Sequence, residues 1–221
     1  MEPMWPRMEV LPSHKSFSHV SLMALAVRQP ARAHYSYSLR QVVCMELAGQ
    51  FLVAMPGIGD PRFARSVVFM CAYSAEGAMG FIINRRAIDL SLAEVFSRMD
   101  METAGGPSAP VYFGGPVQTE RGFVLHLDVT RQSPEPLVIP GGYVLSATRD
   151  VLEDINSGTG PDPFLFAVGY AGWGAGQLDQ EIGQNGWLTA PATPELVFEA
   201  DRDTLWEKVV RSIGIDPLGL S

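Results

Sequence analysis

The stretch GYAGWGAG, at residues 169–176, comes nearest in residue type and spacing to a ligand-binding motif. It follows the apolar run 164–170 and precedes a helical pattern over residues 177–182. At a junction between a strand and a helix, backbone N–H groups and the helix dipole can hold an anion. The residues that would do so here are Gly172, Trp173, Gly174 and Gly176.

Two features of this stretch favour a structural role. A dinucleotide fingerprint would need a glycine where Gln177 stands, and the stretch lacks the Gly-Lys-Ser/Thr of a phosphate-binding loop. Glycines also permit unusual backbone angles and close packing, and the bulky Trp173 needs backbone room beside it. We therefore favour a structural role for these glycines and keep anion binding as the alternative.

A second glycine-rich segment, Gly114-Gly115-Pro116, predicts a tight turn. If this turn lies near residues 169–176, the two segments could form one groove, and Arg121 or Arg65 could supply its positive charge. Turn chemistry by itself also explains a run of glycine and proline. Both interpretations stay open, and the candidate ligand-binding residues of this segment are Gly114, Gly115, Pro116 and Arg121.

The remaining reactive side chains form no catalytic pattern. Cys71 lies within a predicted strand and would be a redox-sensitive thiol if a cation lowered its pKa. The alternative for Cys71 is a small buried apolar residue. His126 is the only histidine after residue 44, and no Ser or Cys stands in a nucleophile motif. We expect no metal site and no cofactor, we favour a protein without enzymatic activity, and we assign no catalytic residue.

Hydrophobic alternation and turn residues predict the elements that position these side chains. Strands are expected over residues 51–55, 66–73, 78–84, 111–113, 122–129, 143–147, 164–170, 187–190 and 196–199. Helices are expected over residues 91–99, 150–156, 177–182 and 203–213. The first of these helices opens with a capping box, because Ser91 precedes Glu94 by three residues. The order of elements favours an α+β domain over a regular β-α-β repeat.

Residues 1–44 differ in composition from the rest of the chain. They contain three of the four histidines and carry a charge of +3, whereas the whole chain carries −8, so residues 45–221 carry −11. The apolar run 20–27, which follows Lys15, outlines a crude signal peptide, and an organellar transit peptide is a second interpretation. We favour a disordered extension that begins at an upstream start codon, with one folded domain over residues 45–221.

The composition limits the partners and the location. With 47% hydrophobic and 18% charged residues, the chain can bury a core. An acidic body repels phosphate backbones, so direct DNA binding is not expected. No apolar run reaches the roughly 20 residues that span a bilayer, and two cysteines give no disulfide framework. We expect a cytoplasmic protein that does not bind membranes.

Three segments of the sequence resemble the YqgE/AlgH family. They are FLVAMPGIGDPRFARSVVFMCAYSAEGAMGFIINR at residues 51–85, YFGGPV at residues 112–117, and GYAGWGAGQLDQEI followed by NGW within residues 169–187. The similarity runs in order from about Met45 to the C-terminal helix. The resemblance implies a compact single domain of the α+β class, with a curved, branched, mostly antiparallel β-sheet and flanking helices.

The resemblance leaves the function open. Members of the family are labelled transcriptional regulators through a genetic link to alginate production, but this sequence shows no helix-turn-helix with a basic recognition face. Our leading hypothesis is a non-enzymatic binding protein with regulatory consequences, whose partner is another protein or a small anionic ligand. The alternative is an enzyme, a hydrolase or a nucleotide-processing activity, that uses a groove near the glycine-rich segments.

Overall fold

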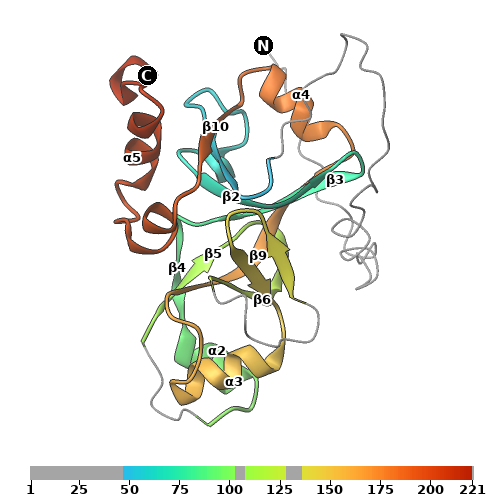
Figure 1. Ribbon diagram of the computed structural model, residues 1–221, viewed down its shortest axis with the longest axis vertical. Coiled ribbons are helices and arrows are strands. Elements are labelled where there is room, and N and C mark those ends of the chain that lie inside the picture. The colour runs from blue at the N-terminus through green and yellow to red at the C-terminus, as the bar shows by residue number, and fades with distance from the viewer. Residues whose placement is uncertain (1–46, 103–107, 128–135, 221) are drawn as a thin grey trace.

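The computed structural model describes residues 47–102, 108–127 and 136–220. In these ranges the chain forms one curved β-sheet with helices packed at both of its ends (Figure 1). The predicted α+β class, with a branched and mostly antiparallel sheet, is confirmed. No helix of this part of the chain is long and apolar enough to cross a membrane. The extension predicted for residues 1–44 lies outside the described residues.

Ten strands of the described residues make up the sheet. They are β1 (Gln50–Ala54), β2 (Val67–Ser74), β3 (Gly77–Ile82), β4 (Arg86–Ser91), β5 (Pro110–Phe113), β6 (Val117–His126), β7 (Leu137–Ile139), β8 (Tyr143–Ser146), β9 (Phe164–Gly174) and β10 (Trp187–Pro191). The main path runs β10-β1-β2-β3-β9-β6-β8-β7, while β5 branches from β9 and β4 pairs with β5. Among these pairings only that of β5 with β9 is parallel.

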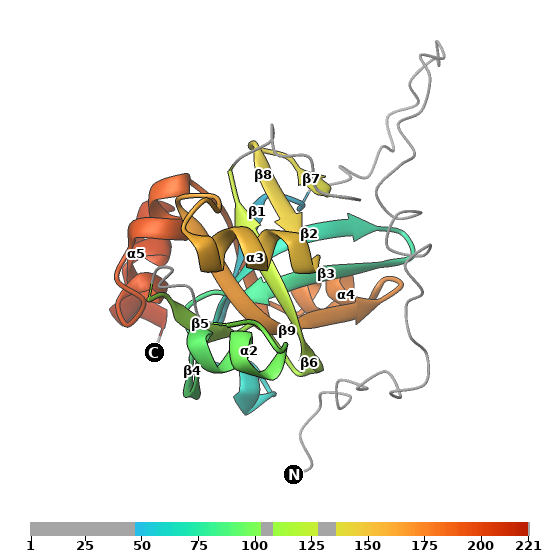
Figure 2. The ribbon, with the colours of Figure 1, turned by 90° about the horizontal axis from the view of Figure 1, so that it is seen from below.

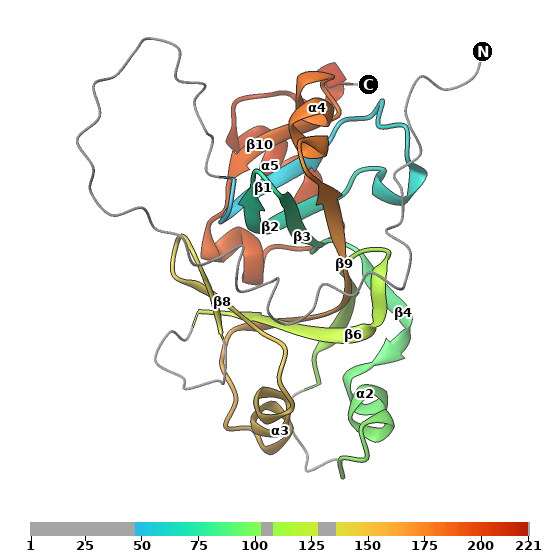
Figure 3. The ribbon, with the colours of Figure 1, turned by 90° about the vertical axis from the view of Figure 1, so that its right-hand side faces the viewer.

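Strand β9 joins the two parts of the sheet. Its residues 164–168 lie between β5 and β6, whereas its residues 171–174 pair with β3. The change of partner takes place around Gly169, whose φ of +69° lies in the left-handed region that favours glycine. The strand therefore runs from one part of the sheet into the other, as Figure 3 shows.

The helices cover opposite ends of this sheet. The α-helices of the described residues are α2 (Leu92–Arg98), α3 (Arg149–Ser157), α4 (Gln177–Gly183) and α5 (Leu205–Ser212). Helices α2 and α3 lie at one end, in front of β6 and β9 in Figure 2, whereas α4 and α5 lie at the other end (Figures 1 and 3). Three short helices complete the description: the 3-10 helices η1 (Pro61–Phe63) and η3 (Pro217–Leu220) and the π-helix η2 (Glu195–Glu199).

Local signals in the sequence explain where α2 and α3 begin and end. The Ser91 hydroxyl accepts a hydrogen bond from the Glu94 N–H at 3.2 Å, and the Glu94 carboxylate accepts one from the Ser91 N–H at 2.7 Å. This is the predicted capping box, and it is confirmed. Helix α3 ends at Gly158, which adopts a φ of +77° as a helix C-cap.

Three apolar clusters hold the elements together. The largest lies inside the curve of the sheet and reaches α5, where the Trp206 indole donates to the Ala54 carbonyl at 2.9 Å. The second packs α4 against β9 and β10 through Trp173 and Trp187. The third packs α2 and α3 on the sheet around Phe166. The third cluster therefore sets the distance between these two helices and the sheet.

Four parts of the chain fold differently from the prediction. Residues 171–174, predicted as a loop, continue strand β9 because they pair with β3. Residues 196–199, predicted as a strand, lie in π-helix η2, whose Leu196 and Phe198 carbonyls accept hydrogen bonds from the buried Arg202 guanidinium at 3.4 and 3.2 Å. Strands β4 and β7 were not predicted, because both are short edge strands whose residues are mostly exposed or half-buried.

Candidate functional site

The two glycine-rich segments pack directly on each other where the sheet branches. The Gly114 N–H donates to the Val168 carbonyl at 2.9 Å. A Cβ added to Gly115 would lie 2.2 Å from the carbonyl carbon of Tyr170, and one added to Gly169 would lie 2.4 Å from the Gly115 oxygen. We call this contact the glycine crossing. The two segments therefore meet through backbone atoms at this contact.

The second half of the stretch 169–176 belongs to a strand and to a helix start. Neither Gly172 nor Gly174 lies in the left-handed region, and both continue β9. The Gly174 N–H, which would face an anion in the alternative interpretation, donates to the Gln177 side-chain oxygen at 3.0 Å. Gly176 has a φ of +70° and caps α4. A Cβ at Gly174 would have its nearest neighbour at 3.8 Å, so the structure does not require a glycine there, and both the structural role and anion binding by these residues stay predictions.

Trp173 is held by a carboxylate that the sequence pattern does not indicate. Its indole N–H donates to Glu181 Oε2 at 2.9 Å, and the Trp187 indole N–H donates to the same oxygen at 2.8 Å. The two indoles are 3% and 2% exposed, and their rings meet edge to face at 5.9 Å. The Gln177 amide donates to Glu181 Oε1 at 2.9 Å. This cluster fixes α4 on β9 and β10, so Trp173 has a structural role here.

Cys71 and His126 lie in the interior. The Cys71 thiol is 2% exposed, and burial raises its pKa well above the ordinary value, so its reactive thiolate is disfavoured. This environment favours the buried apolar residue over the redox-sensitive thiol. His126 Nε2 lies 3.1 Å from the Ser146 hydroxyl, and both residues are 1% exposed. A pair buried in this way holds β6 and β8 together.

The two arginines expected to charge the groove make different contacts. Arg65 lies 4.5 Å from the Trp206 ring and forms an ion pair with Glu207 at 2.8 Å, so its charge is used at α5. The Arg121 guanidinium lies 5.4 Å from the Phe123 ring. Burial raises the pKa of Tyr170, and the charge of Arg121 opposes that rise. Of the two arginines, Arg121 is therefore the one near the glycine crossing.

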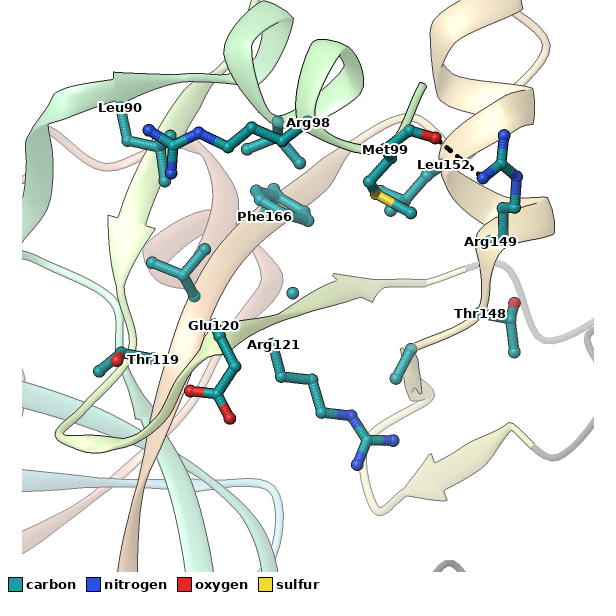
Figure 4. A pocket seen from close by; sticks show the side chains of 14 residues that line it. Leu90, Arg98, Met99, Thr119, Glu120, Arg121, Thr148, Arg149, Leu152 and Phe166 are labelled. Atoms are coloured by element: carbon teal, nitrogen blue, oxygen red, sulfur yellow. Dashed lines mark hydrogen bonds between the residues drawn. The ribbon is translucent and has the colours of Figure 1, made fainter. Parts of the chain in front are cut away.

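A pocket of about 370 Å³ opens between α2, α3 and the strands β6 and β9 (Figure 4). We call it the α2–α3 pocket. Its apolar side chains are Leu90, Val95, Met99, Ala147, Leu152, Phe166 and Val168, and its polar ones are Arg98, Thr119, Glu120, Arg121, Thr148 and Arg149. Phe166 packs closely on β6, because a Cβ at Gly122 would lie 2.6 Å from its ring. The pocket thus has an apolar floor and a polar rim.

The arginines of this rim differ in what they contact. Arg149 donates to the Met99 carbonyl at 2.9 Å, the dashed line of Figure 4, and to Glu153 at 2.7 Å, so it ties α3 to the end of α2. Arg98 is exposed and forms no ion pair with a described residue. In Figure 4 it extends toward Leu90, whereas Arg121 points away from Phe166. The hydrogen bonds from Ser91 and, to a smaller extent, the charge of Arg98 lower the pKa of Glu94, four residues earlier on α2. Arg98 therefore brings to the pocket a positive charge without an ion pair among the described residues.

The described lining of the α2–α3 pocket combines apolar side chains with the ionisable side chains of Arg98, Glu120, Arg121 and Arg149. Its described residues include no Ser, Cys or His, and the described part of the chain holds no group of three acidic, Cys or His side chains that could bind a metal. Sequence reasoning missed this pocket because its lining comes from several separate elements and forms no local motif. The available signal was Val95 and Met99 on the apolar face of a helix that also carries Arg98.

Comparison with known proteins gives one consistent result. A model of the AlgH-like family, DUF179, matches residues 51–218. The UPF0301 protein RSc0675 of Ralstonia nicotianae is 47% identical over 179 residues, which cover 80% of this chain and 93% of the relative. A UPF0301 protein of Jannaschia sp. is 48% identical over 178 residues, with coverages of 80% and 93%.

Two solved structures share the fold. The solution structure of the AlgH protein from Pseudomonas aeruginosa superposes with a TM-score of 0.67 at 37% identity and covers 83% of this chain and 94% of that one. The crystal structure of protein DIP2367 from Corynebacterium diphtheriae superposes with a TM-score of 0.62 at 24% identity, with coverages of 78% and 88%. Together with the family model and the relatives, the first of these shows that the chain belongs to the AlgH-like, or UPF0301, family.

Proposed function

We propose that this protein is a non-enzymatic binding protein, and that its α2–α3 pocket takes a small ligand with an apolar body and an anionic group. The observation that supports this most is the lining, in which seven apolar side chains lie beside the guanidinium of Arg98 at the rim. Small-molecule sites are concave and mostly apolar, with a few polar groups that fix the orientation of the ligand, and 370 Å³ lies in their usual range.

Arg98 is suited to the anionic group because a guanidinium forms charge-assisted, often bidentate hydrogen bonds with carboxylates and other oxyanions. Arg149 supports the site differently, since its guanidinium already contacts Glu153 and the Met99 carbonyl. Occupancy of the pocket would change the contacts between α2 and α3, and the expected regulatory consequences would follow from that change. A cytoplasmic location stays a prediction of the sequence.

The other functions expected from the sequence have less support. A stable protein interface buries roughly 800 Å² per partner, whereas this site has the size of a small-molecule pocket. An enzyme would need converging ionisable side chains, whereas the two glycine-rich segments expected to border its groove pack directly on each other. Direct DNA binding would oppose the charge of −11 on residues 45–221. Gel shifts with duplex DNA at physiological salt test the last of these.

The proposed function is tested by titrating the protein with anilinonaphthalene sulfonate, a fluorescent probe with an aromatic body and one sulfonate. We expect saturable binding that Arg98→Gln weakens about tenfold, the effect of losing one charge-assisted contact. Val95→Trp, which fills the pocket, should abolish binding. Arg211→Gln is the matched control, because Arg211 is an exposed arginine on α5 whose ion pair with Glu207, at 3.5 Å, is remote from the pocket lining.

Thermal melts of all variants show whether the probe reports on the folded state. Equal probe affinity of the wild-type protein, Val95→Trp and Arg98→Gln, with unchanged melting, would place the probe elsewhere and refute the proposed site. Sub-micromolar, sequence-specific DNA binding in the gel shifts would instead support the hypothesis of a transcriptional regulator that binds DNA directly.

A further inference from the structure

We infer that the ligand of the α2–α3 pocket is a monoanionic amphiphilic acid, with one carboxylate or similar group on an aliphatic or aromatic body. This inference rests on the proposed function and narrows it from any anionic ligand to one chemical class. Three observations carry it: the volume of the pocket, the charges on its rim, and the composition of its floor.

The volume sets the size of the ligand. A pocket of about 370 Å³ holds on the order of a dozen water molecules at the ~30 Å³ that each occupies in the liquid. A medium-chain fatty acid or a phenylalkanoic acid has a body of that size.

The rim sets the charge. Arg149 is committed to Glu153 and to the Met99 carbonyl, and Arg121 stacks on Phe123 and points away from Phe166. Arg98 alone among these arginines has neither an ion pair nor a ring contact with a described residue. Glu120 adds a negative charge to the same rim. Arg98 has no ion pair with a described residue, although its charge acts on Glu94, four residues earlier on α2. We expect this rim to favour a ligand with a single negative charge, because both Glu120 and the acidic body oppose a second one.

The floor sets the chemistry of the ligand's body. Phe166 and Leu152 are buried beneath the pocket, and Leu90, Val95, Met99 and Val168 are half-buried around it. A floor of this composition cannot pair the hydroxyls of a sugar, and unpaired polar groups on an apolar surface cost binding free energy. Met99 has an unbranched side chain that can adjust to aliphatic or aromatic bodies. The geometry therefore selects an apolar body with one charged end.

The experiment compares three ligands of equal chain length. Octanoate, suberate and octylamine carry one negative charge, two negative charges and one positive charge, and each is titrated into the full-length protein while calorimetry records binding. We expect octanoate to bind about tenfold more tightly than suberate or octylamine, since a misplaced charge costs at least one charge-assisted contact. Adenosine monophosphate is the fourth probe and should bind more weakly than octanoate.

Two variants connect the result to the rim. Arg98→Gln should weaken octanoate about tenfold and leave neutral octanol unchanged, because only the charged contact is lost. Glu120→Gln should narrow the gap between suberate and octanoate, because it removes the charge that opposes the second carboxylate. The Arg211→Gln control should match the wild-type protein for every ligand.

The failures of the two proposals are distinguishable. If suberate or adenosine monophosphate binds more tightly than octanoate, and Val95→Trp abolishes that binding, the ligand class is wrong while the pocket and the proposed function stand. If octylamine binds most tightly in the same pocket, the assignment of Arg98 is wrong as well. If none of the four ligands and no anilinonaphthalene sulfonate binds, both proposals are wrong.

Discussion

The glycine crossing and the α2–α3 pocket lie along the same strand, β9, and differ in how its neighbours approach it. At Gly169 the absence of a side chain lets the Gly115 backbone come so close that a Cβ would lie 2.4 Å from its oxygen. At Phe166, three residues earlier, a large ring stands between the strand and the helices, and α2 and α3 leave about 370 Å³ beside it. One part of the strand is closed by backbone and the other is left partly open by large side chains.

The two regions also differ in how unusual their sequences are. Glycines mark positions where backbones must meet, and such positions tolerate little change because backbone atoms cannot move aside. The pocket is formed by ordinary leucine, valine and phenylalanine side chains, whose spacing in the sequence is unremarkable. We therefore expect substitutions at the crossing to act on stability, and substitutions at the pocket rim to act on binding.

The largest expected effect is that of Gly169→Ala. A φ of +69° disfavours any residue with a Cβ, and the new methyl group would meet backbone at 2.4 Å. We expect the free energy of unfolding to fall by about 3 kcal/mol or more, the sum of the left-handed strain and of overpacking. Urea denaturation measures this. The matched control is Gly174→Ala on the same strand, whose nearest atom lies 3.8 Å away and which should change stability by less than about 1 kcal/mol. Equal effects of the two variants would contradict the special role of the crossing.

The next largest effect is expected from Glu181→Ala. This change leaves two buried indole N–H groups, those of Trp173 and Trp187, without their acceptor. Each buried unpaired donor costs about 1–3 kcal/mol, so we expect a loss of roughly 2–4 kcal/mol together with a change in tryptophan fluorescence. Glu153→Ala serves as the control, because Glu153 forms an exposed ion pair with Arg149 and should cost less than about 1 kcal/mol. If Glu181→Ala lowers the free energy of unfolding as little as Glu153→Ala does, the two indole N–H groups have found water as an acceptor.

An intermediate effect concerns Tyr143, which belongs to the largest apolar cluster. Burial raises the pKa of Tyr143 from 10 to about 12, and its hydroxyl donates to the Ala192 carbonyl at 3.0 Å. The folded protein keeps this proton where the unfolded chain loses it, so the stability it contributes is complete below pH 10 and is lost as the pH rises to about 12. In the Tyr143→Phe variant, the free energy of unfolding should decrease by roughly 1–2 kcal/mol less than in the wild-type protein between pH 10 and about 12. Denaturation curves at a series of pH values check this, and identical slopes would contradict it.

The smallest effect is expected at the pocket rim. Arg98→Gln should change the free energy of unfolding by less than about 0.5 kcal/mol, because Arg98 is exposed and has no ion pair with a described residue. Its effect should appear in ligand binding alone. A loss of stability above 1 kcal/mol on urea denaturation would show that Arg98 supports the fold, and the contrast between the two regions would then be weaker.

Much of the fold could be predicted from local signals. The strands at the start of the chain, the capping box of α2 and the glycine end of α3 are set by residues close in sequence. The course of residues 171–174 could not be predicted, because it depends on pairing with β3, about 90 residues earlier in the chain. The π-helix η2 depends likewise on the buried guanidinium of Arg202, which a local pattern does not reveal.

The candidate site was less accessible to sequence reasoning than the fold. The glycines drew attention because their spacing is unusual, yet the structure uses them at the crossing, at a helix cap and within a strand. Arg98 and Phe166 come from a helix and a strand far apart in the sequence, and their relation exists only after α2 packs on the sheet. The role of Glu181 was hidden for the same reason, since its partners Trp173 and Trp187 lie on two different strands.

The passage of β9 through both parts of the sheet has a consequence for how the molecule comes apart. Neither part has a complete sheet without this strand, because residues 164–168 lie between β5 and β6 and residues 171–174 pair with β3. The amide protons of both halves of β9 should therefore exchange with solvent in the same global opening, rather than in two separate local ones. We therefore expect that a chain cut beside Gly169 gives two fragments that fold only when they are mixed.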